Sequence, residues 1–352
     1  MEKLYEIYTD AAEDSFEVGR LLFEENGWQL YLTLDELGRD DSLLLIRKSA
    51  VTRLLDQSDY LAEIQRRRKL LTQKGLADPF KLEDKVTLIK SVGSFMDLLP
   101  GQVVYFCLEG EDYQQWGYID EISAGQVNFA AYPSGKYQPF AGKVAVSQLR
   151  RLAAFSGEWL LDNPKLRDTE DTTVDGLCEV HLKEDPASFA VGRLLCADDD
   201  FSLYLTVDEI GRDDSLLLVK KKAVDRVIDR SEYLQDISRC RRQLKERGLE
   251  DPFEVQDKAA EIKQMQDFWQ LAAGQVLSFV MKDEEEAEYG ILKSKEGDAL
   301  SFEQYPSGKY ETFAGQINLA EVDRLEAFGG ELILENDIVS GKDDVTPKIG
   351  TI

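Results

Sequence analysis

The chain repeats itself at a fixed distance of 173 residues, and this duplication limits how it can fold. Val-Gly-Arg-Leu-Leu occurs at 18–22 and 191–195, Gly-Arg-Asp-Asp-Ser at 38–42 and 211–215, and Tyr-Pro-Ser-Gly-Lys-Tyr at 132–137 and 305–310. The first copy aligns with the second without a gap over residues 15–161. Such self-similarity is the signature of tandem repeats. We therefore expect two copies of one folding unit of about 150 residues.

The composition places the boundaries of the repeats. Residues 162–175 are polar and charged, which is typical of a linker, and residues 335–352 have the character of a flexible tail. We predict a first repeat at 1–161 and a second at 176–334. The expected parts are a barrel at about 15–56, helices at about 58–98 and a barrel at about 101–158, then a barrel at about 188–229, helices at about 231–271 and a barrel at about 274–331.

A recurring spacing of apolar residues links the β-rich segments. Apolar side chains lie at i, i+5 and i+8 near the end of each segment, at Ile46, Val51 and Leu54, Val144, Leu149 and Leu152, Val219, Val224 and Val227, and Ile317, Val322 and Leu325. A strand, a one-turn corner and a short closing strand produce this spacing. The expected fold is α+β, mainly β, with two small, strongly bent β-barrels in each repeat, joined by a helical hairpin.

The hairpin is predicted from helical periodicity. Tyr60, Ile64, Arg67 and Leu71 follow the i, i+4, i+7, i+11 pattern of one helix face, and Gly75 stands where a C-terminal cap belongs. The Asp-Pro pair at 78–79 is typical of the start of a second helix. The apolar spacing that follows predicts that this helix continues to about residue 98.

One segment of each repeat resembles a known family. Gly19-x-Leu21 and Leu30-x-Leu32 are similar to the first Sm motif, and residues 46–54 are similar to the second, Ile-Arg-Gly-x-x-Ile-x-x-Ile. The resemblance to Sm-like small β-barrels implies five strongly bent strands and, in many members, RNA binding. The Asn of the RNA-binding members has no clear equivalent here, and Lys48 replaces the Gly of the second motif. The resemblance therefore implies the fold rather than the RNA site.

The charge balance argues against nucleic acid and membrane partners. The chain has 42 Lys and Arg against 68 Asp and Glu, which gives a net charge of −26. Phosphate backbones and anionic lipid surfaces repel such a protein. No run of about 18 apolar residues occurs, so no transmembrane helix is expected. The polar, acidic start lacks the apolar region of a secretory signal, and we expect a cytoplasmic protein.

Residues with catalytic or metal-binding chemistry are few. His181 is the only histidine, and the first copy has Tyr8 in its place. The four cysteines show no Cys-x-x-Cys spacing and are expected to fill apolar positions in a reducing compartment. The acidic turns at 35–41 and 208–214 lack the ligand spacing of a calcium loop. We predict no enzyme activity, no cofactor and no metal site.

Two features offer a recognition surface. The basic islands at 66–69 and 239–242 lie on predicted helices, where pairing with nearby carboxylates is favoured over phosphate contact. The candidate partner-binding residues are the tyrosines and lysines of the repeated turn string: Tyr132, Lys136, Tyr137, Tyr305, Lys309 and Tyr310. Aromatic and cationic groups at a turn bind partners by stacking or cation–π contact. The alternative is a tight turn whose tyrosines pack on their own fold.

These observations favour a non-catalytic intracellular protein-interaction or adaptor protein. Linked modules gain affinity from effective concentration, which suits a duplicated unit without a catalytic constellation. The first alternative is an acidic mimic of nucleic acid that inhibits a nucleic-acid-binding enzyme. The second is an Sm-like RNA-binding protein, which the net charge disfavours. A protein partner is therefore expected rather than nucleic acid or a membrane.

Overall fold

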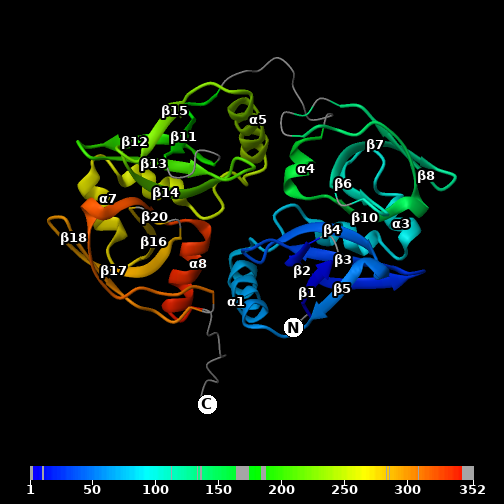
Figure 1. Cartoon of the computed structure of the whole chain (residues 1–352), viewed down its shortest axis with the longest axis horizontal. Coiled ribbons are helices and arrows are strands. Elements are labelled where there is room, and N and C mark those ends of the chain that lie inside the picture. The colour runs from blue at the N-terminus through cyan, green and yellow to red at the C-terminus, as the bar shows by residue number, and fades with distance from the viewer. Residues whose placement is uncertain are drawn as a thin grey trace, which may run out of the picture. The chain divides into compact units, whose positions relative to one another are not determined.

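The computed structural model separates the chain into two compact units, Met1–Asp171 (unit 1) and Thr172–Ile352 (unit 2) (Figure 1). It describes residues 3–9, 12–111, 113–132, 134, 137–163, 174–183, 188–282, 284, 286–307 and 309–342, apart from the side chains of residues 12–14. Most of the predicted linker and the end of the predicted tail, at 164–173 and 343–352, lie outside the described residues.

Unit 1 is mostly β. Its strands are β1 (Tyr5–Thr9), β2 (Ala12–Glu25), β3 (Trp28–Leu34), β4 (Asp40–Arg47), β5 (Val51–Leu55), β6 (Val103–Leu108), β7 (Gln115–Ser123), β8 (Gln126–Ala130), β9 (Gly142–Ala145) and β10 (Leu149–Ala154). Its helices are α1 (Asp59–Lys74), α2 (Leu82–Leu88), α3 (Val92–Met96) and α4 (Gly157–Leu161), with the single 3-10 turns η1 (Lys48–Ala50) and η2 (Val146–Gln148).

Unit 2 repeats this order of elements. Its strands are β11 (Cys178–Leu182), β12 (Phe189–Ala197), β13 (Phe201–Val207), β14 (Asp213–Lys220), β15 (Val224–Ile228), β16 (Val276–Met281), β17 (Glu288–Glu296), β18 (Ala299–Glu303), β19 (Gly315–Asn318) and β20 (Val322–Ala327). Its helices are α5 (Glu232–Glu246), α6 (Val255–Glu261), α7 (Met265–Ala272) and α8 (Gly330–Val339), with the 3-10 turn η4 (Leu319–Glu321). Helix α8 extends into the segment that the sequence assigned to the tail.

The described strands of each unit form one open, antiparallel, 10-stranded sheet. The order is β5-β1-β2-β3-β4-β10-β6-β7-β8-β9 in unit 1 and β15-β11-β12-β13-β14-β20-β16-β17-β18-β19 in unit 2. The prediction of two small Sm-like β-barrels per repeat is therefore wrong. Strand β4 pairs with β10, where Ile46 lies opposite Arg151, so the two halves of the unit continue one hydrogen-bonded ladder instead of closing two.

The apolar spacing that led to the barrel prediction has a local cause. Strand β4, the turn η1 and the short strand β5 follow one another as the spacing predicted, and η2 and η4 form the same corner before β10 and β20. Strand β5, however, pairs with β1 at one end of the sheet, where Leu54 lies opposite Ile7. The corner therefore turns the chain toward an outer strand rather than closing a barrel.

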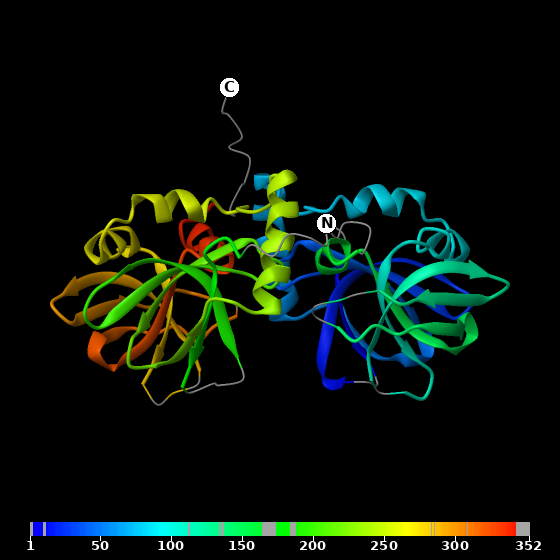
Figure 2. The ribbon, with the colours of Figure 1, turned by 90° about the horizontal axis from the view of Figure 1, so that it is seen from above.

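The helical segment differs from the prediction by one break. Helix α1 ends as predicted at Gly75, which has a left-handed φ of 72°. The second predicted helix is instead two short helices, α2 and α3. Ile89 is extended, and Ser91 accepts a hydrogen bond from the Ser94 backbone N–H to start a new helix. In each unit these short helices lie on one side of the strands (Figure 2).

The repeated Gly-Arg-Asp-Asp-Ser string docks a hairpin turn onto a helix. Gly38 has a φ of 92°, and a Cβ atom there would lie 3.1 Å from the carbonyl oxygen of Ile64 in α1. Arg68 of the same helix donates to the Gly38 carbonyl at 3.1 Å and pairs with the Asp40 carboxylate at 2.9 Å. Arg241 makes the same two contacts in unit 2. These members of the basic islands therefore pair with carboxylates inside their own unit.

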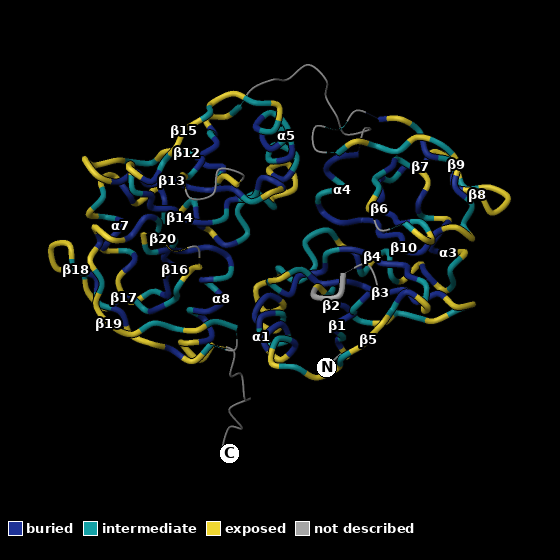
Figure 3. Tube along the Cα trace, viewed as in Figure 1, coloured by how far each residue is buried: buried dark blue, intermediate teal, exposed yellow. Residues whose placement is uncertain are grey.

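Buried side chains follow the strands of each unit, and the exposed residues gather in turns and at outer edges (Figure 3). The largest apolar cluster of unit 1 joins both halves of the sheet to the short helices, and includes Leu45, Phe95, Phe106, Phe129 and Leu152. No helix within the described residues is long and apolar enough to cross a membrane.

Candidate functional site

The tyrosines of the predicted partner-binding string pack within their own units. In each copy the first tyrosine of the string is buried: Tyr132 in unit 1 and Tyr305 in unit 2. The second tyrosine stacks on an aromatic ring of β7 or β17. These stacked pairs are Tyr137 on Trp116, with ring centroids 4.5 Å apart, and Tyr310 on Tyr289, with centroids 3.7 Å apart.

The lysines of the same string are only partly described. Lys136 lies outside the described residues, as do Pro133, Gly135 and Gly308. The Lys309 Nζ atom lies 2.7 Å from a carboxylate oxygen of Glu331, on α8 of its own unit. Partner binding by this string therefore stays a prediction, and its tyrosines supply packing in both copies.

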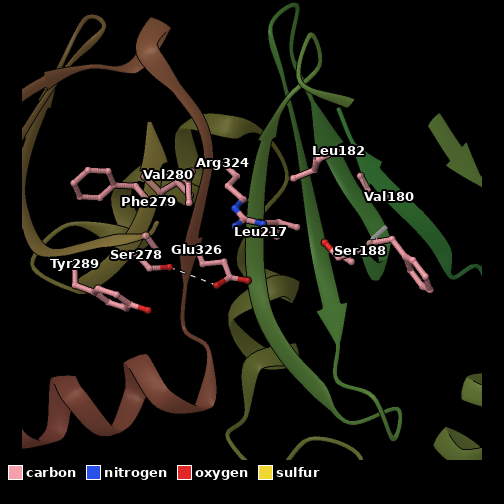
Figure 4. Close-up of a pocket in the computed structure, with 14 residues that line it drawn as sticks. Val180, Leu182, Ser188, Leu217, Ser278, Phe279, Val280, Tyr289, Arg324 and Glu326 are labelled. Carbon is pink, nitrogen blue, oxygen red and sulfur yellow. Dashed lines mark hydrogen bonds between the residues drawn. The ribbon is translucent and has the colours of Figure 1, made fainter. Parts of the chain in front are cut away.

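Unit 2 holds a pocket that the sequence did not predict. Its volume is about 240 Å³. Its walls come from the segments β11, β12, β14, β16, β17 and β20, which the sheet brings together. The lining residues are Val180, Leu182, Ser188, Phe189, Ala190, Leu217, Ser278, Phe279, Val280, Ala287, Tyr289, Arg324, Leu325 and Glu326 (Figure 4).

Two opposite charges lie side by side in this pocket. Arg324 and Glu326 are two residues apart on β20, so their side chains leave the same face of the strand. Figure 4 shows both side chains projecting from β20 toward β14, where Leu217 lies. One wall of the pocket therefore carries both a guanidinium group and a carboxyl group.

The surroundings of Glu326 favour its neutral form. The Ser215 hydroxyl donates to one carboxyl oxygen at 3.3 Å, and the Ser278 hydroxyl donates to the other at 3.4 Å. Burial raises the pKa of Glu326, and the positive charge of Arg324 opposes that shift. Two long hydroxyl contacts satisfy a half-buried carboxylate weakly, because charged acceptors form shorter and stronger hydrogen bonds. The carboxyl group can therefore accept a further, stronger hydrogen bond.

The positive charge of Arg324 faces the pocket. Within the described part of the chain, its guanidinium group makes no hydrogen bond or ion pair. The equivalent Arg151 of unit 1 has two partners: the Glu17 carboxylate pairs with it, and the ring of Tyr105 lies 4.9 Å away. Unit 2 replaces both partners with smaller residues, Ala190 and Ser278.

The same place in unit 1 is filled with aromatic rings. Tyr105 is buried and stacks on Trp159, with ring centroids 6.0 Å apart, and Trp116 lies 5.9 Å from the same ring. Burial raises the pKa of Tyr105, which keeps its phenol protonated. Unit 2 has a serine in place of Tyr105 and a leucine in place of Trp159. Ser278, which replaces Tyr105, lines the pocket together with Arg324 and Glu326, so the missing Tyr105 ring leaves space there.

The sequence contained a signal for this pocket, but it lay in the differences between the copies. Unit 1 has Ala153 where unit 2 has Glu326, and Tyr105 where unit 2 has Ser278. An apolar residue exchanged for a carboxylate, and a ring exchanged for a hydroxyl, are unusual at strand positions that face a core. Sequence analysis followed the identical string at 132–137 and 305–310 instead.

The other reactive side chains have structural partners. His181 is buried, with Nε2 3.0 Å from a carboxylate oxygen of Glu179 and Nδ1 3.3 Å from Arg226. Asp35 accepts from the Arg39 guanidinium at 2.6 Å, which closes the acidic turn on itself. Among the described residues, no group of three or more His, Cys, Asp or Glu side chains is arranged to hold a metal ion.

No protein-family model matches the chain, and no curated protein matches it either. The Sm-like resemblance therefore gains no support from relatives, and the open sheets contradict it. What the pocket can bind is argued below from its own residues.

Proposed function

We propose that this protein is a non-catalytic binding protein in which unit 2 holds a small ligand and unit 1 keeps the same scaffold with the equivalent space filled. One observation carries the proposal: the copies share their framework strings but differ where the pocket is lined. Opening a cavity and placing a carboxyl group in it both reduce stability. Side chains that reduce stability in a duplicated scaffold are expected where they bind something.

The size of the pocket limits the ligand. Pockets for drug-sized molecules have volumes of about 300–1,000 Å³, and this pocket has about 240 Å³. Apolar side chains such as Leu217 and Phe279 line the pocket together with polar groups, and polar groups of this kind fix the orientation of a ligand. The proposed ligand is therefore a small molecule rather than a peptide or a nucleic acid strand.

The contacts in the pocket support binding rather than catalysis. An activated nucleophile lies within about 2.6–3.2 Å of its base. Ser278 lies farther than this from Glu326, at 3.4 Å, and donates to it as a simple hydroxyl. The only histidine of the chain, His181, is engaged by Glu179 and does not line the pocket.

The protein partner and the cytoplasmic location expected from the sequence stay part of this proposal. None of the four cysteines forms a disulfide, which suits a reducing compartment. Two linked units also allow one unit to bind the ligand while the other contacts a partner. The link raises the effective concentration of the second binding site once the first is occupied.

Ligand-observed NMR tests the proposal on the full chain. The probes are polar fragments of at most about 12 non-hydrogen atoms, a size that suits a small pocket. We expect at least one fragment to bind the wild type, to be recovered unchanged, and to bind Ser278→Tyr at least tenfold more weakly. That substitution refills the space as Tyr105 does in unit 1.

The matched control is Ser294→Tyr, which adds the same ring at an exposed position of β17 outside the pocket. It should bind the fragments as the wild type does, and thermal melting should first show that both variants are folded. The proposal is wrong if no fragment binds the wild type, or if every binder is unaffected by Ser278→Tyr.

A further inference from the structure

We propose that the pocket of unit 2 takes a small dipolar ion of the amino-acid class, with its carboxylate on Arg324 and its ammonium group on Glu326. This inference rests on the proposed function and adds the chemical class of the ligand. Three observations carry it: the open guanidinium group, the weakly satisfied carboxyl group, and their placement on one face of β20.

The guanidinium group of Arg324 is suited to binding an anion. Its five N–H donors form a planar fork that matches a carboxylate in two parallel hydrogen bonds. In unit 1 the fork of Arg151 already has such a partner, the carboxylate of Glu17. Unit 2 has Ala190 at that position, so a ligand carboxylate would take the place that Glu17 occupies in the other copy.

The carboxyl group of Glu326 is suited to binding a cation. Among the residues that the structure describes, only Ser215 and Ser278 donate to its oxygens, and both contacts are long. An ammonium group supplies three strong donors and a compensating charge, which a buried carboxylate needs in order to ionise. Tyr289, whose ring stacks on Tyr310, lines the same pocket.

The spacing of the two groups favours both charges on one molecule. Residues two apart on a strand are separated by about 6.6–6.8 Å along it. A simple anion would pair with Arg324 but would give the Glu326 carboxyl group no strong donor. A simple cation would leave Arg324 without a partner. A dipolar ion satisfies both groups and enters without net charge, which lowers the cost of burial.

The remainder of the pocket sets the size and polarity of the rest of the ligand. Val180, Leu217 and Val280 present apolar surface, and Phe279 completes this wall. Together with the small volume, this lining suits a short apolar side chain or an unbranched carbon chain between the charged ends.

Isothermal titration calorimetry with the full chain tests the ligand class. The probes are the twenty L-amino acids, glycine included, together with β-alanine and 4-aminobutyrate, which vary the separation of the charges. The tightest binder is then compared with its N-acetyl derivative, which lacks the ammonium group, and with its primary amide, which lacks the carboxylate. We expect both derivatives to bind at least tenfold more weakly.

Two variants assign the ends of the ligand. Arg324→Gln should weaken binding of the dipolar ion at least tenfold but change binding of its amide much less. Glu326→Gln should weaken the dipolar ion in the same way but change its N-acetyl derivative much less. Arg324→Lys replaces the first variant if Arg324→Gln does not fold.

The controls are Arg242→Gln and Glu296→Gln, which make the same changes in unit 2 at residues that do not line the pocket. They should bind as the wild type does. The inference is overturned if no dipolar ion binds, or if the singly charged derivatives bind as tightly. If a neutral or singly charged fragment then still binds and is lost in Ser278→Tyr, the proposed function stands while this inference fails.

Discussion

Asp41, on β4, makes the stability of unit 1 depend on pH. The Ser156 hydroxyl donates to its carboxyl group at 3.3 Å. Burial, reinforced by the carboxylates of Asp35 and Glu17, raises the pKa of Asp41 from 3.8 to about 7. The folded state therefore binds this proton more tightly than the unfolded chain does. Unit 1 loses stability as the pH rises from about 4 to about 7, because the unfolded chain releases this proton over that range while the folded state retains it.

Removing the charge of Asp41 should reduce the pH dependence of the unfolding free energy of unit 1. We expect Asp41→Asn to be more stable than the wild type by about 2–4 kcal/mol above pH 7, and the difference to vanish below about pH 4. Urea unfolding between pH 4 and pH 8 measures this difference in unfolding free energy. Asp120→Asn, at an exposed position of β7, is the control and should keep the wild-type slope. An unchanged slope in Asp41→Asn would contradict the assignment.

Single residues also show why the candidate site escaped sequence analysis. The identical strings at 132–137 and 305–310 drew attention to tyrosines that pack within their own units, and partner binding by these residues stays a prediction. The exchanges that open the pocket, such as Ser278 for Tyr105 and Glu326 for Ala153, were visible in the alignment of the copies. Their meeting in one cavity was not visible, because it depends on β11, β16 and β20 lying together in the sheet.

At the scale of elements, local features were predictable and long-range pairing was not. The spacing of apolar residues predicted the strand, corner and short strand of β4, η1 and β5, since those residues are neighbours in sequence. The same spacing fits a closed barrel and an open sheet equally. The pairing of Ile46 with Arg151 decides between them, and it joins residues about 100 positions apart.

Short elements outside the periodic pattern were also missed. Strand β1 lies before the region where the copies match clearly, and α4 is a five-residue helix after β10. The break between α2 and α3 kept the apolar spacing of a continuous helix across it. Only the cap residue Ser91 marked the new start, and a serine within a helical pattern is a weak signal.

The turn at Gly211 packs closely against helix α5, and this close contact can be tested. Gly211 has a φ of 93°, and a Cβ atom there would lie 2.9 Å from the carbonyl oxygen of Ile237. We expect Gly211→Ala to destabilise unit 2 by about 2–3 kcal/mol, because the residue meets both backbone strain and a close contact. Thermal melting should show a midpoint lower by about 4–8 °C.

The control for this prediction is Gly297→Ala. Gly297 also has a positive φ, 59°, but a Cβ atom there meets nothing within 4 Å. Unit 1 carries Ala124 at the equivalent position with a φ of 49°, so alanine is tolerated in that turn. A loss of about 1 kcal/mol or less is expected. Equal losses in the two variants would show that the contact with α5 is unimportant.

At the scale of the whole molecule, the duplication has produced two structurally complete units. Each has its own 10-stranded sheet with the same strand order. Each also has buried clusters drawn from its own residues, such as those around Phe106 in unit 1 and around Tyr305 in unit 2. Domains of about 150 residues bury enough surface to fold alone. The binding chemistry can therefore differ between the copies without a change of scaffold.

This organisation predicts that each half folds by itself. Residues 1–171 and 172–352, expressed separately, should each give a cooperative thermal transition, and an equimolar mixture should reproduce the sum of the two curves. Gly211→Ala should lower the midpoint of the second half by the same few degrees as in the full chain, since every contact it disturbs lies within unit 2. Asp41→Asn should likewise keep its whole effect in the first half, because Ser156, Asp35 and Glu17 all belong to unit 1. Aggregation or non-cooperative melting of either half would show that the sheet of that unit is incomplete without the rest of the chain.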